Sequence, residues 1–249
     1  MFNVEKATND CIQWIRDWFS QNGPGCNAIV GISGGKDSSI VAALCVKALG
    51  KDRVIGILMP QGQQKDIDAA YKLCEYLNIK SYEINIGDTV RSVLSRLESS
   101  GIEISEQTKI NLPARIRMST LYAVSQSCNG RVANTCNLSE TLLSWETRWG
   151  DAVGDFSPLQ DFTVEEVKLI GSELGLPREL IEKIPWDGLC GTTDEEALGF
   201  PYSIFDRYVR TGNITDENIK GKINSRISKY KFKRLPIPYF HSGLPRYIN

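Results

Sequence analysis

Apolar positions in the first part of the chain follow two alternating patterns. Ile12, Ile15 and Phe19 fall on one face of a helix over residues 4–19, whereas 27–32 is a short, nearly continuous apolar run. The alternation continues, with helices predicted over 38–48, 66–77 and 88–98 and strands over 53–59 and 80–86. Short strands that alternate with amphipathic helices indicate a parallel sheet.

The second part of the chain begins with the same alternation and then changes. A longer helix is predicted to pass through Leu121 and to end at Gly130, and a fourth strand follows over 131–135. The tetrapeptide TVEE at 163–166 is a capping box, which opens a helix to Leu174. The last third is predicted to consist mostly of short helices and loops.

This order of elements predicts an α/β fold, a doubly wound, Rossmann-like parallel sheet with helices on both faces. We expect one domain spanning residues 1–249. Ligands of such sheets bind beyond the carboxyl ends of the strands. The segment 31–39 and the residues from Thr135 onward fall at those ends, so both are candidate site segments.

Composition narrows the classes of function. The formal net charge is −1, so no global field attracts nucleic acid or membranes, and no apolar run approaches the roughly 20 residues that span a bilayer. The N-terminus is amphipathic and acidic, unlike a signal peptide, so a cytoplasmic protein is expected. The seven cysteines form no CxxC pair, and His241 is the single histidine. A histidine metal cluster is therefore excluded.

The sequence GISGGKDSS, residues 31–39, follows the first predicted strand. It is not a Walker A loop, and Ser33 interrupts the GxGxxG spacing. Gly34 and Gly35 allow a tight turn with amides directed inward, next to the start of a helix. Asp37 would repel bare phosphate, so its presence indicates Mg²⁺ between carboxylate and phosphate. The alternative is a plain βα turn with Asp37 as the helix N-cap.

Several motifs resemble a known family. SGGKDS resembles the SGGxDS pyrophosphate loop of the ATP pyrophosphatase superfamily, which has an adenine nucleotide alpha-hydrolase-like fold. The segments NLPARIRMSTLY (111–122), NTCNLSETLLSWETRWGDAVGDFSPL (134–159) and IPWDGLCGTTDEEALGF (184–200) are similar to motifs of NAD synthetases. The resemblance implies an ammonia-dependent member, because glutamine-using relatives carry an extra amidase domain for which 249 residues leave no room.

The resemblance also implies roles for individual residues. ATP would be bound by Gly31, Ile32, Ser33, Gly34, Gly35, Lys36, Asp37, Ser38 and Thr135. Asp37 and Glu140 would be the catalytic pair that holds Mg²⁺, although Glu140 alone could simply complement a helix dipole. Deamido-NAD would be bound by Arg115, Arg148, Asp151, Asp155 and Lys233. The family forms homodimers, and the helix over 110–128 is a candidate interface, although it could equally be part of the buried core.

Four positions depart from the family pattern. Arg148 replaces a substrate-binding lysine, and Val164 replaces a lysine that contacts ATP. Trp186 replaces a small hydroxyl residue, and Phe232 replaces the histidine of a His-Lys pair. Val164 could instead pack inside its capping box. Lys36 or Lys183 could supply the missing positive charge.

The favoured function is amidation of deamido-NAD by ammonia through an adenylated intermediate, giving NAD, AMP and pyrophosphate. A tRNA-thiolating ATP pyrophosphatase is one alternative, which the net charge and the absence of CxxC disfavour. A nucleotide-binding protein that has lost catalysis is another, suggested by Val164 and Trp186.

Overall fold

A computed structural model describes residues 2–64, 67–182 and 193–245. Within these ranges lies a four-stranded sheet in the order β3-β2-β1-β4. Its strands are β1 (Asn27–Gly31), β2 (Val54–Leu58), β3 (Lys80–Glu83) and β4 (Gly130–Val132). Every neighbouring pair is parallel. The chain therefore extends the sheet in one direction from β1 to β3 and then returns to the other side of β1 with β4.

Eleven helices are found among the described residues, together with two short 3₁₀ turns, η1 (Lys51–Arg53) and η2 (Lys231–Lys233). The helices are α1 (Val4–Asn22), α2 (Lys36–Leu49), α3 (Asp68–Leu77), α4 (Gly87–Ser99), α5 (Glu106–Ser127), α6 (Leu138–Leu143), α7 (Val164–Glu173), α8 (Arg178–Ile181), α9 (Asp194–Leu198), α10 (Tyr202–Thr211) and α11 (Glu217–Lys229). No helix of the described ranges has the length and apolar character needed to cross a bilayer.

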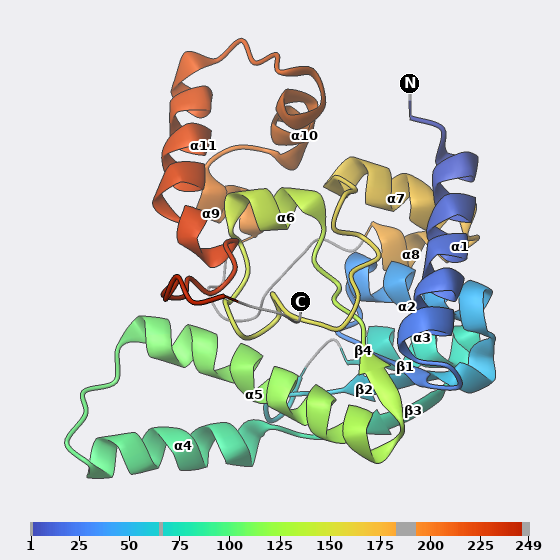
Figure 1. Cartoon of the computed structure of the whole chain (residues 1–249), viewed down its shortest axis with the longest axis horizontal. Coiled ribbons are helices and arrows are strands. Elements are labelled where there is room, and N and C mark those ends of the chain that lie inside the picture. The colour runs from blue at the N-terminus through green and yellow to red at the C-terminus, as the bar shows by residue number, and fades with distance from the viewer. Residues whose placement is uncertain (1, 65–66, 183–192, 246–249) are drawn as a thin grey trace.

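The sheet is covered on both faces because its side chains alternate between two cores. Ala28 and Val30 of β1 pack in the core that contains α1, α2 and α7. Ile29 and Ile57 point to the other face, where Met118 of α5 and residues of α4 cover them. Figure 1 shows α5 crossing the sheet opposite α1 and α2. The predicted α/β fold with helices on both faces is confirmed.

Gly130 does not end a helix, contrary to the prediction. Helix α5 ends at Ser127, Asn129 takes the left-handed conformation with φ 46°, and Gly130 is the first residue of β4. A Cβ atom on Gly130 would lie 2.4 Å from Cγ1 of Ile29. Glycine is required here because β4 packs closely against β1. The strand also ends at Val132, earlier than predicted.

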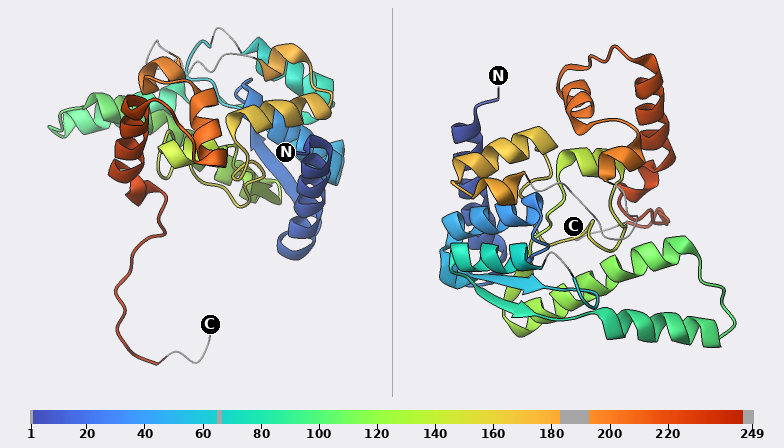
Figure 2. Two further views of the ribbon diagram at one scale, coloured as in Figure 1. Left: turned by 90° about the horizontal axis from the view of Figure 1, so that it is seen from above. Right: turned by 180° about the vertical axis from the view of Figure 1, so that it is seen from behind.

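A third apolar cluster joins α6 to the helices of the last third of the chain, α9, α10 and α11. Its buried members include Leu143, Val164, Leu198 and Phe205. Figure 2 shows α10 and α11 side by side at one end of the molecule. Val164 is buried here, so the residue that replaces a family lysine packs in a core, as the sequence allowed. This cluster fixes α6, which carries Glu140, against the start of α7.

Candidate active site

The loop between β1 and α2 is a tight turn held by its own hydroxyls. Gly34 has φ 76°, a left-handed conformation that favours glycine. The Ser38 hydroxyl donates to the Gly35 carbonyl oxygen at 3.1 Å and lies 3.1 Å from Oγ of Ser33. A Cβ atom on Gly34 would approach the backbone nitrogen of Ala70 to 2.9 Å. The loop therefore packs on α3, and only glycine fits at its tip.

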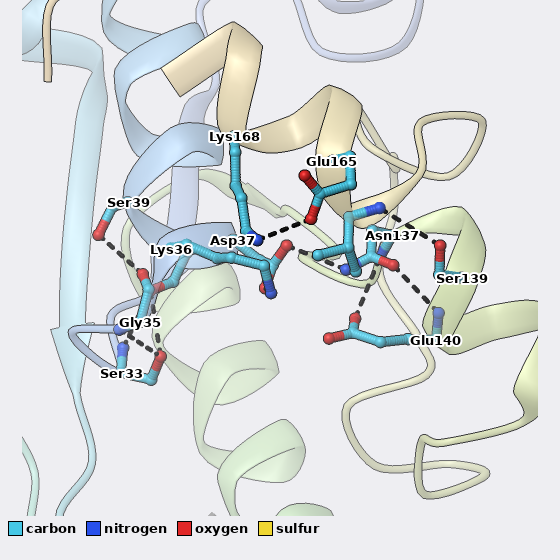
Figure 3. Close-up of polar contacts among 12 residues, drawn as sticks. Ser33, Gly35, Lys36, Asp37, Ser39, Asn137, Ser139, Glu140, Glu165 and Lys168 are labelled. Atoms are coloured by element: carbon cyan, nitrogen blue, oxygen red, sulfur yellow. Dashed lines mark hydrogen bonds and ion pairs between the residues drawn. The ribbon is translucent and has the colours of Figure 1, made fainter. Parts of the chain in front are cut away.

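Asp37 is oriented by two partners from different parts of the chain. Lys36, which is 3% exposed, places its Nζ 2.7 Å from Oδ2 of Asp37. Oδ1 of Asp37 accepts a hydrogen bond from Nδ2 of Asn137 at 3.0 Å (Figure 3). The N-cap of α2 is Gly35, and no side chain caps this helix. The alternative that Asp37 is merely an N-cap is therefore wrong.

Glu140 lies beside Asp37 because of a capping box at the start of α6. Asn137 is the N-cap, and its Oδ1 accepts from the Glu140 amide at 3.0 Å. Oε2 of Glu140 accepts in return from the Asn137 amide at 3.2 Å. Asn137 thus bonds to both acids (Figure 3). It was missed as a site residue, although the NxxE spacing at 137–140 signals a capping box.

Electrostatics at this junction favour a bound cation. Burial raises the pKa of Glu140, the negative charge of Asp37 raises it further, and Lys36 opposes both effects. For Lys36, burial would lower the pKa, but Asp37 and Glu140 outweigh burial and raise it. Two carboxylates thus face one ammonium group, and hydrogen bonds orient both acids. Asp194 adds a further negative charge that acts on Glu140.

The donor set fits Mg²⁺, which is commonly held by one or two carboxylates together with substrate phosphates. The described residues contain no cluster of three or more candidate metal ligands. A cation at Asp37 and Glu140 would therefore depend on the nucleotide for the remaining oxygen ligands.

Thr135 lies half-buried after β4, in a loop organised by its neighbour Asn134. Nδ2 of Asn134 donates to the carbonyl oxygens of Asp151 and Val153, at 2.8 and 3.3 Å. Its Oδ1 accepts from the Cys136 amide at 3.0 Å. Asn134 therefore links the segment that follows β4 to the loop that carries the predicted substrate residues. Asn134 begins the family-like segment 134–159, but nothing in the sequence indicated this linking role.

Arg115 and Arg148, two predicted substrate residues, lie together. Nε of Arg115 donates to the Arg148 carbonyl oxygen at 3.3 Å. The guanidinium carbon of Arg148 is 4.9 Å from the ring centre of Trp149 and 5.7 Å from that of Phe232. Trp149 has φ 64°, which is unusual for a bulky residue. Two departures from the family pattern, Arg148 and Phe232, are therefore in contact.

Lys233, a third predicted substrate residue, also lies in this region. Its Nζ donates to the carbonyl oxygens of Ser144 and Glu146, at 3.0 and 2.7 Å. Lysine side chains stabilise helix C-termini in this way, and these carbonyls follow the end of α6. Lys233 therefore fixes the loop that leads from Glu140 to Arg148.

The two predicted substrate aspartates hold backbone amides. Oδ1 of Asp151 accepts from the Thr147 amide at 2.9 Å, which makes Asp151 a turn-forming residue. Oδ2 of Asp155 accepts from the Val132 amide at 2.7 Å, on the side of β4 that does not pair with β1. The structure thus places Asp155 against the edge of the sheet. Trp186 and Lys183 lie outside the described residues.

Glu146 is a buried acid in this loop that the sequence analysis did not identify. It is 8% exposed, and its Oε2 has no hydrogen-bond partner among the described residues. Burial raises the pKa of Glu146 to about 7, while the charge of Lys233 acts in the opposite direction. The charges of Asp151, Arg234 and Arg226 also act on it. The site loop thus contains a carboxyl group that titrates near neutrality.

We expect Glu146 to make stability depend on pH. Its folded pKa lies above the ordinary value of 4.5, so its stabilising effect is complete below pH 4.5 and is lost as pH rises to about 7. Glu146→Gln should remove this loss and stabilise the protein at pH 8 by about 2 kcal/mol relative to wild type. Urea unfolding at pH 5 and pH 8 measures the effect, with exposed Glu98→Gln as control. Equal pH dependence in Glu146→Gln and wild type would contradict it.

Comparisons with known proteins agree with the resemblance of the motifs. A family model described as NAD synthase matches residues 7–236. The NH(3)-dependent NAD(+) synthetase of Pyrococcus furiosus is 36% identical over 205 residues, which are 82% of this chain and 77% of that protein. The protein of the same name from Archaeoglobus fulgidus is 35% identical over 239 residues, or 93% of this chain and 95% of that protein.

A solved structure shares the fold as well. The NMN synthetase of Francisella tularensis superposes with a TM-score of 0.87 at 29% identity, covering 96% of this chain and 100% of that one. The predicted resemblance is confirmed. Because the family match extends from α1 to beyond α11 and includes both acids, the chain belongs to the NAD synthase family of ligases.

Proposed function

We propose that the protein is an ammonia-dependent NAD synthetase that joins AMP to the carboxylate of deamido-NAD and then replaces AMP by ammonia. The observation that carries this proposal is the linkage of Asp37 to Glu140 through Asn137, at the ends of β1 and β4. Parallel α/β sheets bind ligands where the strand order reverses, and this junction is such a place. ATP-binding roles follow for residues 31–38 and Thr135.

In the first step, an oxygen of the substrate carboxylate attacks the α-phosphorus of ATP. The bond from that phosphorus to the bridging oxygen breaks, and pyrophosphate leaves. The Gly34 amide and the N-terminus of α2 stabilise the charge on the departing group. Asp37 and Glu140 would hold Mg²⁺, which neutralises the phosphates when it is bound. Lys36 and Asn137 keep the Asp37 carboxylate in place.

In the second step, the nitrogen of ammonia attacks the acyl carbon of the adenylate. The bond between this carbon and the phosphate oxygen breaks, AMP leaves, and the nitrogen loses a proton to give the amide. No covalent bond to the protein is formed, so the task of the site is to position two substrates. Arg148 and Arg115 supply positive charge for the substrate phosphates, and Lys233 holds the loop from which Arg148 projects.

The proposal is tested with the purified full chain, deamido-NAD, Mg²⁺-ATP and ammonium. NAD, AMP and pyrophosphate should form in equal amounts, measured by chromatography. Without ammonium, labelled pyrophosphate should exchange into ATP only when deamido-NAD is present. ATP binding with neither NAD nor AMP formed would favour the protein that has lost catalysis. AMP formation that requires tRNA would favour the thiolating alternative.

A second candidate is formation of NMN by amidation of the corresponding mononucleotide acid. The observation that favours it is the likeness to the Francisella tularensis NMN synthetase, at a TM-score of 0.87. The chemistry at the carboxylate is the same, and the two acids differ only in the AMP portion of deamido-NAD. Comparing kcat/KM for deamido-NAD and for the mononucleotide in the same assay decides between them. The compound with the higher value is the substrate.

A further inference from the structure

Tyr202 has a buried hydroxyl group without a hydrogen-bond partner among the described residues. The residue is 3% exposed, and its ring packs in the apolar cluster with Leu143, Val164 and Phe205. Buried hydroxyl groups nearly always find a partner, because an unpaired one costs about 1–3 kcal/mol. This exception therefore requires an explanation, and the surroundings of the hydroxyl supply one.

The charges of several acids act on this hydroxyl. Burial raises the pKa of Tyr202 above its ordinary value, and the charges of Glu140, Asp194 and Asp37 raise it further, in that order. The hydroxyl therefore keeps its proton and is a hydrogen-bond donor. Two of these acids, Asp37 and Glu140, are the proposed Mg²⁺ ligands. The hydroxyl donates to no acceptor among the described residues, so an oxygen atom of a bound ligand would satisfy it.

The position of Tyr202 is fixed by α10. The Tyr202 amide donates to Oε1 of Glu195 at 2.8 Å. One turn further along α10, Asp206 accepts from the Ser139 hydroxyl at 2.6 Å and from the Glu165 amide at 3.0 Å. These bonds tie α10 to α6, which carries Glu140, and to the start of α7. The hydroxyl is therefore held in place before any ligand arrives, which reduces the entropic cost of binding.

We propose that Tyr202 is a further ligand-binding residue of this site, whose hydroxyl donates a hydrogen bond to an oxygen atom carried by the bound divalent cation. That oxygen belongs either to a water ligand or to a nucleotide phosphate, and both present the same acceptor chemistry. The inference rests on the proposed function, because it assumes the cation at Asp37 and Glu140. It adds the N-terminus of α10 to the two strand ends that form the site.

Calorimetric titration of the full chain tests the proposal. Wild type and Tyr202→Phe are titrated with Mg²⁺ alone, Mg²⁺-pyrophosphate and Mg²⁺-ATP. We expect Tyr202→Phe to weaken Mg²⁺-ATP binding about tenfold, the effect of one hydrogen bond to a charged group. Weaker binding of Mg²⁺ alone would identify a water ligand, whereas weaker binding confined to pyrophosphate and ATP would identify a phosphate oxygen. The melting temperature should not fall, because the hydroxyl has no partner in the free protein.

Two further variants separate the inference from the proposed function. Tyr208→Phe, on the same helix, is the matched control and should bind Mg²⁺-ATP as wild type does. If Asp37→Asn loses binding while Tyr202→Phe retains it, the inference about Tyr202 is overturned and the metal site stands. If neither change affects binding, the metal site fails together with the inference. A large fall in melting temperature for Tyr202→Phe would show a structural role and also overturn the proposal.

Discussion

Asp37→Asn should reduce kcat/KM for NAD formation by about 10³-fold while the protein stays folded. The substitution keeps the shape of the side chain and removes the charge that we assign to the cation. It also leaves one acceptor oxygen for two donors, Nζ of Lys36 and Nδ2 of Asn137. Both the charge and the orientation of this ligand are therefore lost. Steady-state kinetics over a range of Mg²⁺ concentrations measures the effect.

The stability of Asp37→Asn should change much less than its activity. Asp37 and Glu140 share a single buried ammonium, and the charge of Asp37 raises the pKa of Glu140. Without Asp37, Glu140 ionises more readily and can neutralise Lys36. The buried ammonium group of Lys36 therefore keeps a negative charge beside it. This limits the loss of stability when Asp37 is replaced. We expect thermal unfolding to shift by only a few degrees.

Asp88→Asn is the matched control for this experiment. Asp88 also lies in the first turn of a helix, α4, where it pairs with Arg91, and its side chain is 90% exposed. Its replacement should leave the kinetics of NAD formation unchanged, because it lies on a solvated surface. Equal losses of activity and stability in Asp37→Asn would indicate that Asp37 serves the fold and not the reaction.

Gly154→Ala should destabilise the protein by about 3 kcal/mol, which corresponds to a fall of about 10 °C in melting temperature. A Cβ atom at position 154 would lie 2.6 Å from the backbone nitrogen of Asn134 and 3.0 Å from its Cα. These are main-chain atoms next to β4, so they cannot move aside as a flexible side chain could. The loop that contains Asp151 and Asp155 would be displaced, and KM for deamido-NAD should rise.

Gly221→Ala provides the comparison, because it is the same substitution without the clash. Gly221 lies inside α11, and nothing lies within 4 Å of a Cβ atom placed there. Alanine is favoured over glycine in helices by about 1 kcal/mol, so Gly221→Ala should raise the melting temperature slightly. Differential scanning calorimetry of both variants tests the argument. If Gly154→Ala unfolds at the wild-type temperature, the close packing of the loop on Asn134 is refuted.

The parts of the fold that could be predicted are those determined by local patterns. The runs at 27–32 and 53–59 are nearly continuous in apolar residues because β1 and β2 are buried on both faces. The capping box at Thr163 marks the start of α7 at its observed position. Gly130 was misinterpreted because glycine suits both a helix end and a strand in close contact. Only the distance to Ile29 distinguishes the two.

In the site too, local sequence patterns predicted some features, whereas others depend on contacts between distant parts of the chain. Motif resemblance and the βα order indicated that Asp37 and Glu140 lie at neighbouring strand ends, and the structure links them through Asn137. The bonds of Lys233 to two carbonyls could not be predicted, since they depend on how η2 meets the end of α6. The buried carboxyl of Glu146 has no sequence signal, because acids are normally expected at the surface.

The hydrogen bond between Asp37 and Asn137 joins residues that are 100 positions apart in the sequence. A polypeptide emerging from the ribosome therefore displays the complete glycine turn long before the opposite half of the site has been synthesised. Contacts between such distant segments form late, because a long loop must close first. We therefore expect recovery of enzymatic activity during refolding to wait for the insertion of β4 beside β1, however early the individual helices form.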